Sequence, residues 1–114
     1  MEKSKTGSDI PAAEKLRLLN LVGYQEGAVV SRTLLNRVAG TITIFAFDEG
    51  QGLSEHTAPY AALVHVLEGE ADITISGKHL RVVAGEMVLL PANQPHALIA
   101  VTKFKMLLTM IRST

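Results

Sequence analysis

A regular succession of short apolar segments and turn residues runs through most of the sequence, and it limits the fold more than any other feature. Each segment has the length of one β-strand, and the residues between segments, such as Ser76-Gly77-Lys78, favour tight turns. The segments span 28–35, 41–47, 61–68, 71–76, 79–83, 86–90, 96–101 and 104–111. Many short strands with a turn about every 8–12 residues indicate an all-β sandwich or a closed barrel.

The polarity pattern of two segments indicates how they are covered. Residues 71–76 alternate, with isoleucines on one face and Asp, Thr and Ser on the other, as in a strand with one face in solvent. Residues 104–111 are apolar on both faces after Lys105. A strand covered on both faces needs a second layer, which would be either the N-terminal segment or a partner subunit.

The chain is expected to divide into an N-terminal extension, residues 1–27, and a β-barrel, residues 28–114. The stretch 11–22 is predicted to form a short helix within the extension. Pro11 suits the first turn of such a helix, and Gly23 would end it.

Composition excludes several classes of protein. Eleven basic residues balance eleven acidic ones without a basic cluster, so nucleic acid is not expected as a main partner. No apolar run approaches the roughly 20 residues of a membrane helix, and the N-terminus lacks the apolar core of a signal peptide. The chain has no cysteine, so it offers neither a disulfide nor a thiolate ligand, which agrees with a cytoplasmic protein.

Two of the four histidines stand in informative surroundings. His56 follows a glycine-rich loop, and His96 closes the proline-framed turn 91–95. Antiparallel strands would allow both to reach one mouth of a barrel. Because neutral imidazole is the commonest transition-metal ligand, the pair is a candidate metal site. His79, beside the Gly77 turn, is expected to be exposed to solvent.

These surroundings resemble the two motifs of the cupin family. Gly50–Gly69 is similar to the first motif, in which a glycine precedes His-x-His, a glutamate and a second glycine. Gly85–Ala100 is similar to the second, in which a proline-framed turn ends in a histidine. The resemblance implies a double-stranded β-helix, or jelly-roll barrel, and a homodimer.

The match to the family's metal ligands is partial. Cupins with a full site bind a divalent metal through two histidines and a glutamate of the first motif and one histidine of the second. His56 and His96 match two of these positions, whereas Ala58 and Ala62 replace the second histidine and the glutamate. The resemblance therefore implies a two-histidine pocket for Fe, Mn, Ni or Zn.

Any third ligand would come from outside the motif positions, and Gln51, Glu55 and His65 are the candidates. Strand alternation argues against His65, which points away from the face that carries Ala62. Tyr60 shares the parity of the inward positions, so it is either a ligand contact or a rim aromatic. We expect Tyr60 and Gln51 to contact a bound small molecule.

Three functions remain open at this point. The first is a small-molecule-binding protein with a reduced metal site, because the two alanines enlarge the pocket and remove ligands. The second is a metal-dependent isomerase or dioxygenase that uses His56, His96 and a third group. The third is a structural or regulatory module that acts through its dimer surface. The family hosts many reactions, so the fold alone does not choose among them.

Overall fold

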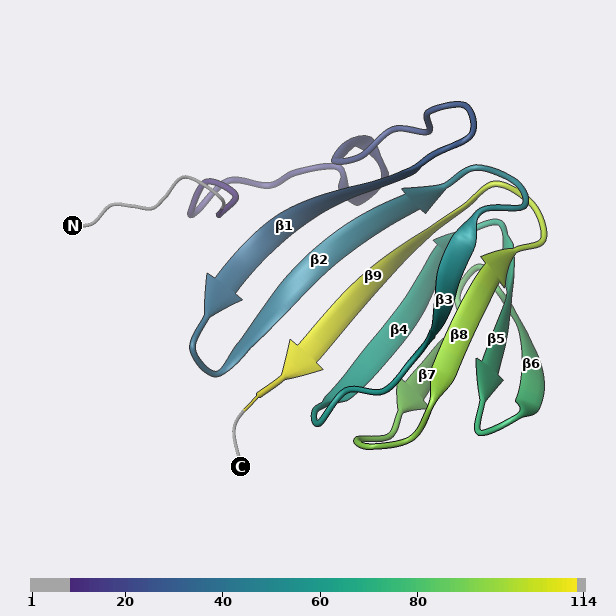
Figure 1. Ribbon diagram of the computed structural model, residues 1–114. Helices are drawn as coiled ribbons and strands as arrows, with labels where there is room; N and C mark the ends of the chain where they lie inside the picture. The colour runs from purple at the N-terminus through teal and green to yellow at the C-terminus, as the bar shows by residue number, and fades with distance from the viewer. Residues whose placement is uncertain (1–8, 113–114) are drawn as a thin grey trace.

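The computed structural model describes residues 9–112, which form an all-β barrel of two antiparallel sheets (Figure 1). One sheet has the strand order β1-β2-β9-β4-β7, and the other has the order β3-β8-β5-β6. The strands are β1 (Val29–Arg37), β2 (Gly40–Phe47), β3 (Gly52–His56), β4 (Ala61–Glu68), β5 (Glu70–Ile75), β6 (Lys78–Val83), β7 (Met87–Leu90), β8 (His96–Ala100) and β9 (Phe104–Ile111). The jelly-roll barrel predicted from the sequence is confirmed.

All eight predicted strands are present, and β3 is an additional one that the sequence did not reveal. Its residues, Gly52–His56, are mostly polar and exposed, and only Leu53 is partly buried. This segment is an edge strand that pairs with β8, from Gly52 opposite Ile99 to His56 opposite His96. An edge strand with little buried surface lacks the apolar alternation by which a strand is recognised.

The helix predicted over residues 11–22 is wrong. The described part of the extension is irregular apart from a single 3₁₀ turn, Leu18–Asn20. Ala13 has φ 62°, outside the helical region, and the Leu19 and Leu21 carbonyl oxygens accept hydrogen bonds from the Lys105 ammonium group and from Arg32. Tertiary contacts with the sheet therefore override the local helical preference. Residues 1–8 and 113–114 lie outside the described residues.

The extension covers part of the outer face of the five-stranded sheet. Val22 is buried there with Ile44 and Ala46 of β2, and Tyr24 packs against the same cluster. The Tyr24 hydroxyl donates a 2.6 Å hydrogen bond to Glu68. Burial and this carboxylate together raise the pKa of Tyr24, so the phenol keeps its proton at any ordinary pH. The extension thus covers Lys105 and Leu107 on the outer face of β9, whereas Ile111 farther along the strand is exposed.

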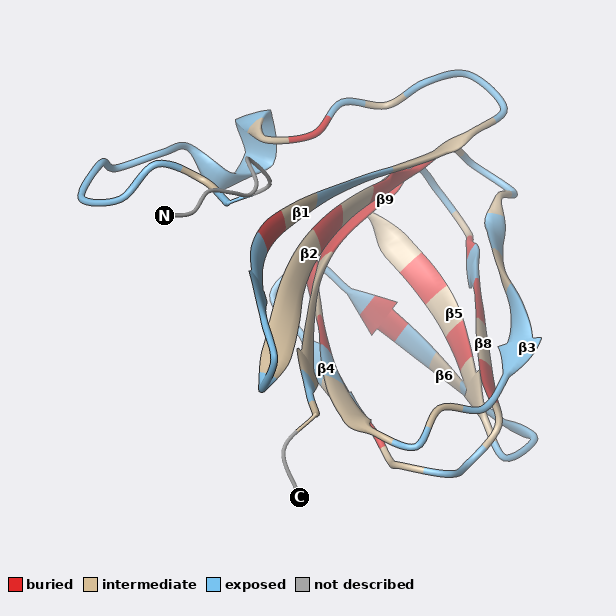
Figure 2. Ribbon diagram, turned by 60° about the vertical axis from the view of Figure 1, so that its left-hand side comes forward, coloured by how far each residue is buried: buried red, intermediate tan, exposed pale blue. Residues whose placement is uncertain are grey.

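The main core lies between the two sheets, where buried residues alternate with exposed ones along the strands (Figure 2). Phe47 and Phe104 are opposite each other in the β2–β9 ladder, and their rings stack with centroids 4.5 Å apart. Both side chains are completely buried. These rings close one end of the barrel, and aliphatic side chains fill the space toward the other end. Among residues 9–112, no helix is long and apolar enough to cross a membrane.

Antiparallel connectivity sorts the loops into two groups. The β1–β2, β3–β4, β5–β6 and β7–β8 connections share one end of the barrel, which we call the mouth (Figure 1). The β2–β3, β4–β5, β6–β7 and β8–β9 connections share the opposite end. His56 ends β3 and His96 begins β8, so both histidines stand at the mouth.

The one-residue connection between β4 and β5 requires glycine for two reasons. Gly69 has φ +80°, and a Cβ there would lie 2.0 Å from the Lys103 carbonyl oxygen. Gly77 has a similar φ of +82° but open space around its Cα. An alanine at either position adopts an unfavourable left-handed conformation, but only at Gly69 does it also clash with backbone.

We predict that Gly69→Ala lowers the free energy of unfolding by about 1–3 kcal/mol more than Gly77→Ala does. Urea denaturation of the two variants measures this difference. Equal losses in both variants would contradict the close approach of β4–β5 to the Lys103 carbonyl.

Candidate functional site

The β3–β8 pairing brings the two predicted histidines into contact at the mouth. His56 and His96 are register partners, and their Nε2 atoms lie 3.2 Å apart. The ring centroids are 4.4 Å apart, and the ring planes meet at 71°. Two residues separated by 40 positions in the sequence therefore form one constellation.

Each ring is anchored through its other nitrogen. Nδ1 of His56 lies 2.9 Å from the Ser54 carbonyl oxygen, and Nδ1 of His96 lies 3.2 Å from the Gln94 carbonyl oxygen. Because a carbonyl oxygen only accepts hydrogen bonds, each of these contacts is a hydrogen bond when Nδ1 carries the proton. In two neutral rings with this tautomer, the Nε2 lone pairs face each other.

The loop before β8 is fixed on both sides, and this sets the position of His96. Asn93 adopts a left-handed conformation, with φ 66°, and its backbone N–H donates a 2.7 Å bond to the Ala58 carbonyl. On the other side, Ser76 donates its hydroxyl to Gln94 Oε1 and its backbone N–H to the Pro95 carbonyl. These carbonyl anchors and loop ties were not predicted. The tolerance of Asn for positive φ was the one signal in the sequence.

The histidine pair stands at the entrance of a small apolar cavity of about 40 Å³. His96 is buried, with 9% of its surface exposed, whereas His56 is exposed to solvent. The remaining lining residues are Leu53, Val64, Leu90, Ala97, Leu98, Met106 and Leu108. One side of the imidazole pair therefore contacts an almost wholly aliphatic surface, and the other side contacts water.

Burial lowers the pKa of His96, and the neighbouring His56 lowers it further. The hydrogen bond to the Gln94 carbonyl opposes both effects, because it favours the protonated ring. A lowered pKa favours the neutral form of His96 near pH 7, and the neutral ring is the form that donates a lone pair to a metal.

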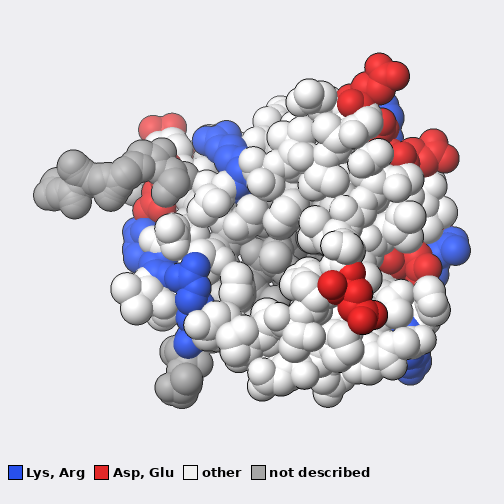
Figure 3. Space-filling view, viewed as in Figure 1, with Lys and Arg blue, Asp and Glu red and all other residues white. Residues whose placement is uncertain are grey.

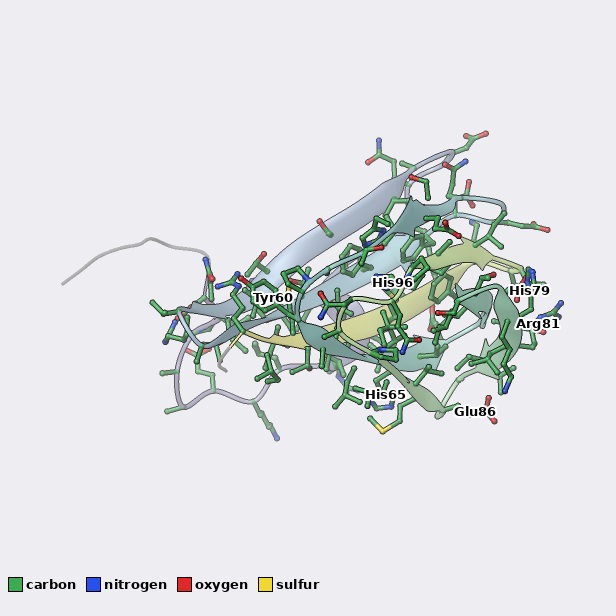
Figure 4. All side chains as sticks on the ribbon, turned by 60° about the horizontal axis from the view of Figure 1, so that its bottom comes forward. Tyr60, His65, His79, Arg81, Glu86 and His96 are labelled. Carbon is green, nitrogen blue, oxygen red and sulfur yellow. The ribbon has the colours of Figure 1, made fainter. Side chains whose placement is uncertain are left out.

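No third acidic or histidine side chain from the described part of the chain joins the pair in a metal-binding group. Within residues 9–112, no group of three His, Cys, Asp or Glu side chains is placed to hold one metal ion. Ala62 packs against the core cluster between the sheets. His65 alternates with the buried Val64 and Val66 of β4, so it lies on the outer face of that sheet, as strand parity predicted (Figure 4).

The other predicted contacts lie apart from the cavity. Tyr60 is in the bend before β4 at the mouth end, partly buried and well separated from His96 (Figure 4). Gln51 precedes β3 at the opposite end of the barrel, where its backbone bonds to Ala100 and Asp48. Neither residue lines the cavity, and their roles as ligand contacts stay predictions. His79 is exposed and contacts Asp72 and Thr74 on the outer face of the other sheet.

Comparison with known proteins agrees with this architecture. The family model described as a cupin domain matches residues 43–112, which is more than half of the chain. The chain belongs to the cupin family. The matched region contains both histidines, the strands β3 to β9 and the second half of β2 of this cupin.

Several solved structures are similar to this cupin over most of its length. A conserved protein of unknown function from Streptococcus pyogenes is 39% identical, with 93% of each chain covered and a TM-score of 0.88. A cupin superfamily protein from Desulfitobacterium hafniense is 28% identical, with 92% of this chain and 96% of that chain covered and a TM-score of 0.86. A cupin 2 conserved barrel domain protein from Leptotrichia buccalis is 42% identical over 85% of this chain and 47% of that chain, with a TM-score of 0.82. No curated protein matches the sequence.

The lowered pKa of His96 predicts how stability depends on pH. Because the folded pKa is below the unfolded value of about 6.5, the unfolded chain binds more protons as the pH falls through that value. We predict that His96 makes its full contribution to the free energy of unfolding above about pH 6.5, and that this contribution declines at lower pH.

Urea denaturation from pH 5 to pH 8, with a chelator present, measures this effect. The His96→Gln variant should lose less stability below about pH 6.5 than the wild type does. If the two proteins show the same pH dependence, burial of a neutral His96 is contradicted.

Proposed function

We propose that this cupin binds a small molecule at the mouth of its barrel, and that His56 and His96 hold one divalent transition metal that takes part in binding. The observation that carries the proposal is the pair of Nε2 atoms 3.2 Å apart, each on a ring whose Nδ1 contacts a backbone carbonyl. The proposal concerns binding, and it assigns no reaction to the site.

Two facing lone pairs repel each other unless a cation lies between them. A hydrogen bond between the two Nε2 atoms would require one ring to move its proton, and that ring would then present a lone pair to a carbonyl oxygen. Either arrangement leaves one unfavourable contact. A shared proton or a metal ion removes the conflict, because each ring keeps its Nδ1–H bond and donates its Nε2 lone pair. Nδ1–H bonds of this kind commonly orient metal-binding histidines.

The separation of the two nitrogens fits one metal ion. Nitrogens that each lie about 2.0–2.1 Å from the same ion, at adjacent coordination positions, are roughly 3.0–3.4 Å apart. The observed 3.2 Å falls within that range without movement of either ring. Imidazole ligands suit Zn, Ni and Fe, which are three of the four metals that the family resemblance implies. Bound there, such an ion would act as a Lewis acid for oxygen or nitrogen donors of a ligand.

Two protein ligands leave most coordination positions for water or for a bound molecule. The aliphatic cavity beside the pair, of about 40 Å³, accommodates water or a small group of that molecule. The larger part of any ligand would lie in the open mouth. Isomerase or dioxygenase sites commonly use three protein ligands. The lack of a third suitable side chain within residues 9–112 therefore favours binding over those reactions.

We predict that untagged protein incubated with Zn, Ni, Mn or Fe salts and then desalted retains up to one metal ion per chain. The His96→Ala variant should retain several-fold less, because one of only two protein ligands is gone. Plasma mass spectrometry of the desalted samples measures both.

The matched control is His79→Ala, which removes a histidine on the outer face of the other sheet. It should retain metal as the wild type does. Two results would contradict the proposed site: a wild type that retains no metal with any of the salts, or a His96→Ala variant that retains as much metal as the wild type.

A second observation favours a homodimer. The outer face of β4, β7 and β9 beyond the extension carries several large apolar side chains with 38–57% of their surface exposed. They are Leu63, Met87, Leu89 and Ile111. Leu63 and Leu89 are cross-strand neighbours, and Met87 stands opposite His65 on the same face. We propose that a second copy of the chain covers this patch, because contiguous apolar surface of this kind marks association.

We predict that Leu89→Glu shifts the protein toward the monomer, because a carboxylate in the patch would lose its hydration on association. Sedimentation velocity measures the shift. Val38→Glu is the control, since Val38 is 95% exposed at the β1–β2 turn. A wild type that is monomeric at high micromolar concentration would contradict the dimer.

A further inference from the structure

The β1–β2 hairpin has the reverse of the usual polarity of a barrel wall. In most sandwiches the inner face is apolar and the outer face is polar. Here the outer face of β2 carries Ile42 and Ile44, and residues of the N-terminal extension cover it. The inner face carries Thr41 and Thr43 at the mouth end, before Phe45 and the core begin.

The neighbouring strand extends this polar inner surface. Thr33 of β1 is the register partner of Thr43, and Ser31 is the partner of Phe45. We call the four side chains Ser31, Thr33, Thr41 and Thr43 the hydroxyl wall. None of their hydroxyls bonds to another described residue, although the three threonines are partly buried. The wall thus presents unused donors and acceptors to the inside of the barrel.

The hydroxyl wall continues directly into the histidine cavity. Thr43 pairs with Leu108 of β9, and Leu108 pairs with Val64 of β4. Both Leu108 and Val64 line the cavity beside His56 and His96. Register partners are about 4.5–5.5 Å apart, so the nearest hydroxyl is one strand from the cavity lining.

The inner surface around the wall carries no charge. The inward positions of β1, β2, β9 and β4 that share its rows are apolar or hydroxyl-bearing, apart from the amide of Asn36, the register partner of Thr41. From the side of the molecule that faces the viewer in Figure 1, the surface shows a hollow without Lys, Arg, Asp or Glu in its floor (Figure 3). A ligand that owed its affinity to charge would find no counter-charge on this wall. Hydroxyls both donate and accept, which matches the hydroxyls of a neutral ligand.

We infer that the ligand of this cupin is a neutral polyhydroxylated small molecule, such as a sugar or a polyol, which lies along the hydroxyl wall with one end at the histidine pair. The inference rests on the binding function proposed above and adds the chemical class of the ligand. The apolar floor formed by Leu108 and Met110 contacts the carbon faces of the same molecule.

Ligand-observed NMR tests this with a panel of neutral pentoses, hexoses and alditols, beside cyclohexanol and benzyl alcohol as apolar probes. At least one polyhydroxylated probe should bind, and it should bind more tightly than either apolar probe. Thr43→Val and Thr41→Val keep the size and branching of the side chain and remove the hydroxyl. Each should weaken that binding by roughly three- to tenfold, as expected for one lost hydrogen bond.

Thr109→Val is the matched control. Thr109 lies on the outer face of β9, opposite Ile42, and its substitution should leave affinity unchanged. Binding of the apolar probes alone, or equal affinity in Thr43→Val and the wild type, would overturn the inference.

The metal content of the same samples separates the two proposals. Retained metal without binding of any polyhydroxylated probe overturns the ligand class alone. Loss of both metal retention and small-molecule binding overturns the proposed function as well.

Discussion

The Nε2 atoms of His56 and His96 face each other across 3.2 Å, and the proposed site depends on that arrangement. The backbone carbonyls of Ser54 and Gln94 lie against the Nδ1 atoms on the far side of both rings and favour protons there. The strands fix the rings in this position because β3 and β8 pair with His56 opposite His96. The local structure therefore creates a site that a cation stabilises, with only two side chains of the protein as ligands.

The rest of the barrel divides into regions with different tasks. The stacked Phe47 and Phe104 fill the end away from the mouth. The N-terminal extension covers the apolar outer face of β1 and β2, with Tyr24 bonded to Glu68. On the inner face of the hairpin, Phe45 and Phe47 belong to the core, and the threonines nearer the mouth do not. The hydroxyl wall and the histidine cavity can then form one continuous surface at the mouth.

Much of the fold could be predicted from the sequence, because turn residues and β-branched segments recur with strand spacing. The exceptions have physical reasons. The segment Gly52–His56 was missed because an edge strand buries too little to show alternation. The helix over 11–22 was predicted from local signals, whereas contacts of Leu19 and Leu21 with the sheet determine the actual path.

The candidate site was predictable only in part. Motif positions identified His56 and His96, and strand parity placed His65 on the outer face. The carbonyl contacts of the two rings could not be predicted, because every residue has a backbone carbonyl and its identity does not show which one accepts a hydrogen bond. Gln51 shows the same limit. It is close to His56 in the sequence, but the extended strand β3 lies between them and places Gln51 at the opposite end of the barrel.

The ring protons of His56 and His96 give the most direct test of the central claim. Long-range ¹H–¹⁵N NMR of chelator-treated protein, before and after addition of Zn²⁺, reports the state of each ring nitrogen. The account predicts that both histidines carry the proton on Nδ1 in the zinc-loaded protein, and that the two Nε2 resonances shift together on loading. A zinc-loaded protein in which either histidine carries its proton on Nε2, or in which neither Nε2 resonance moves, would contradict the account.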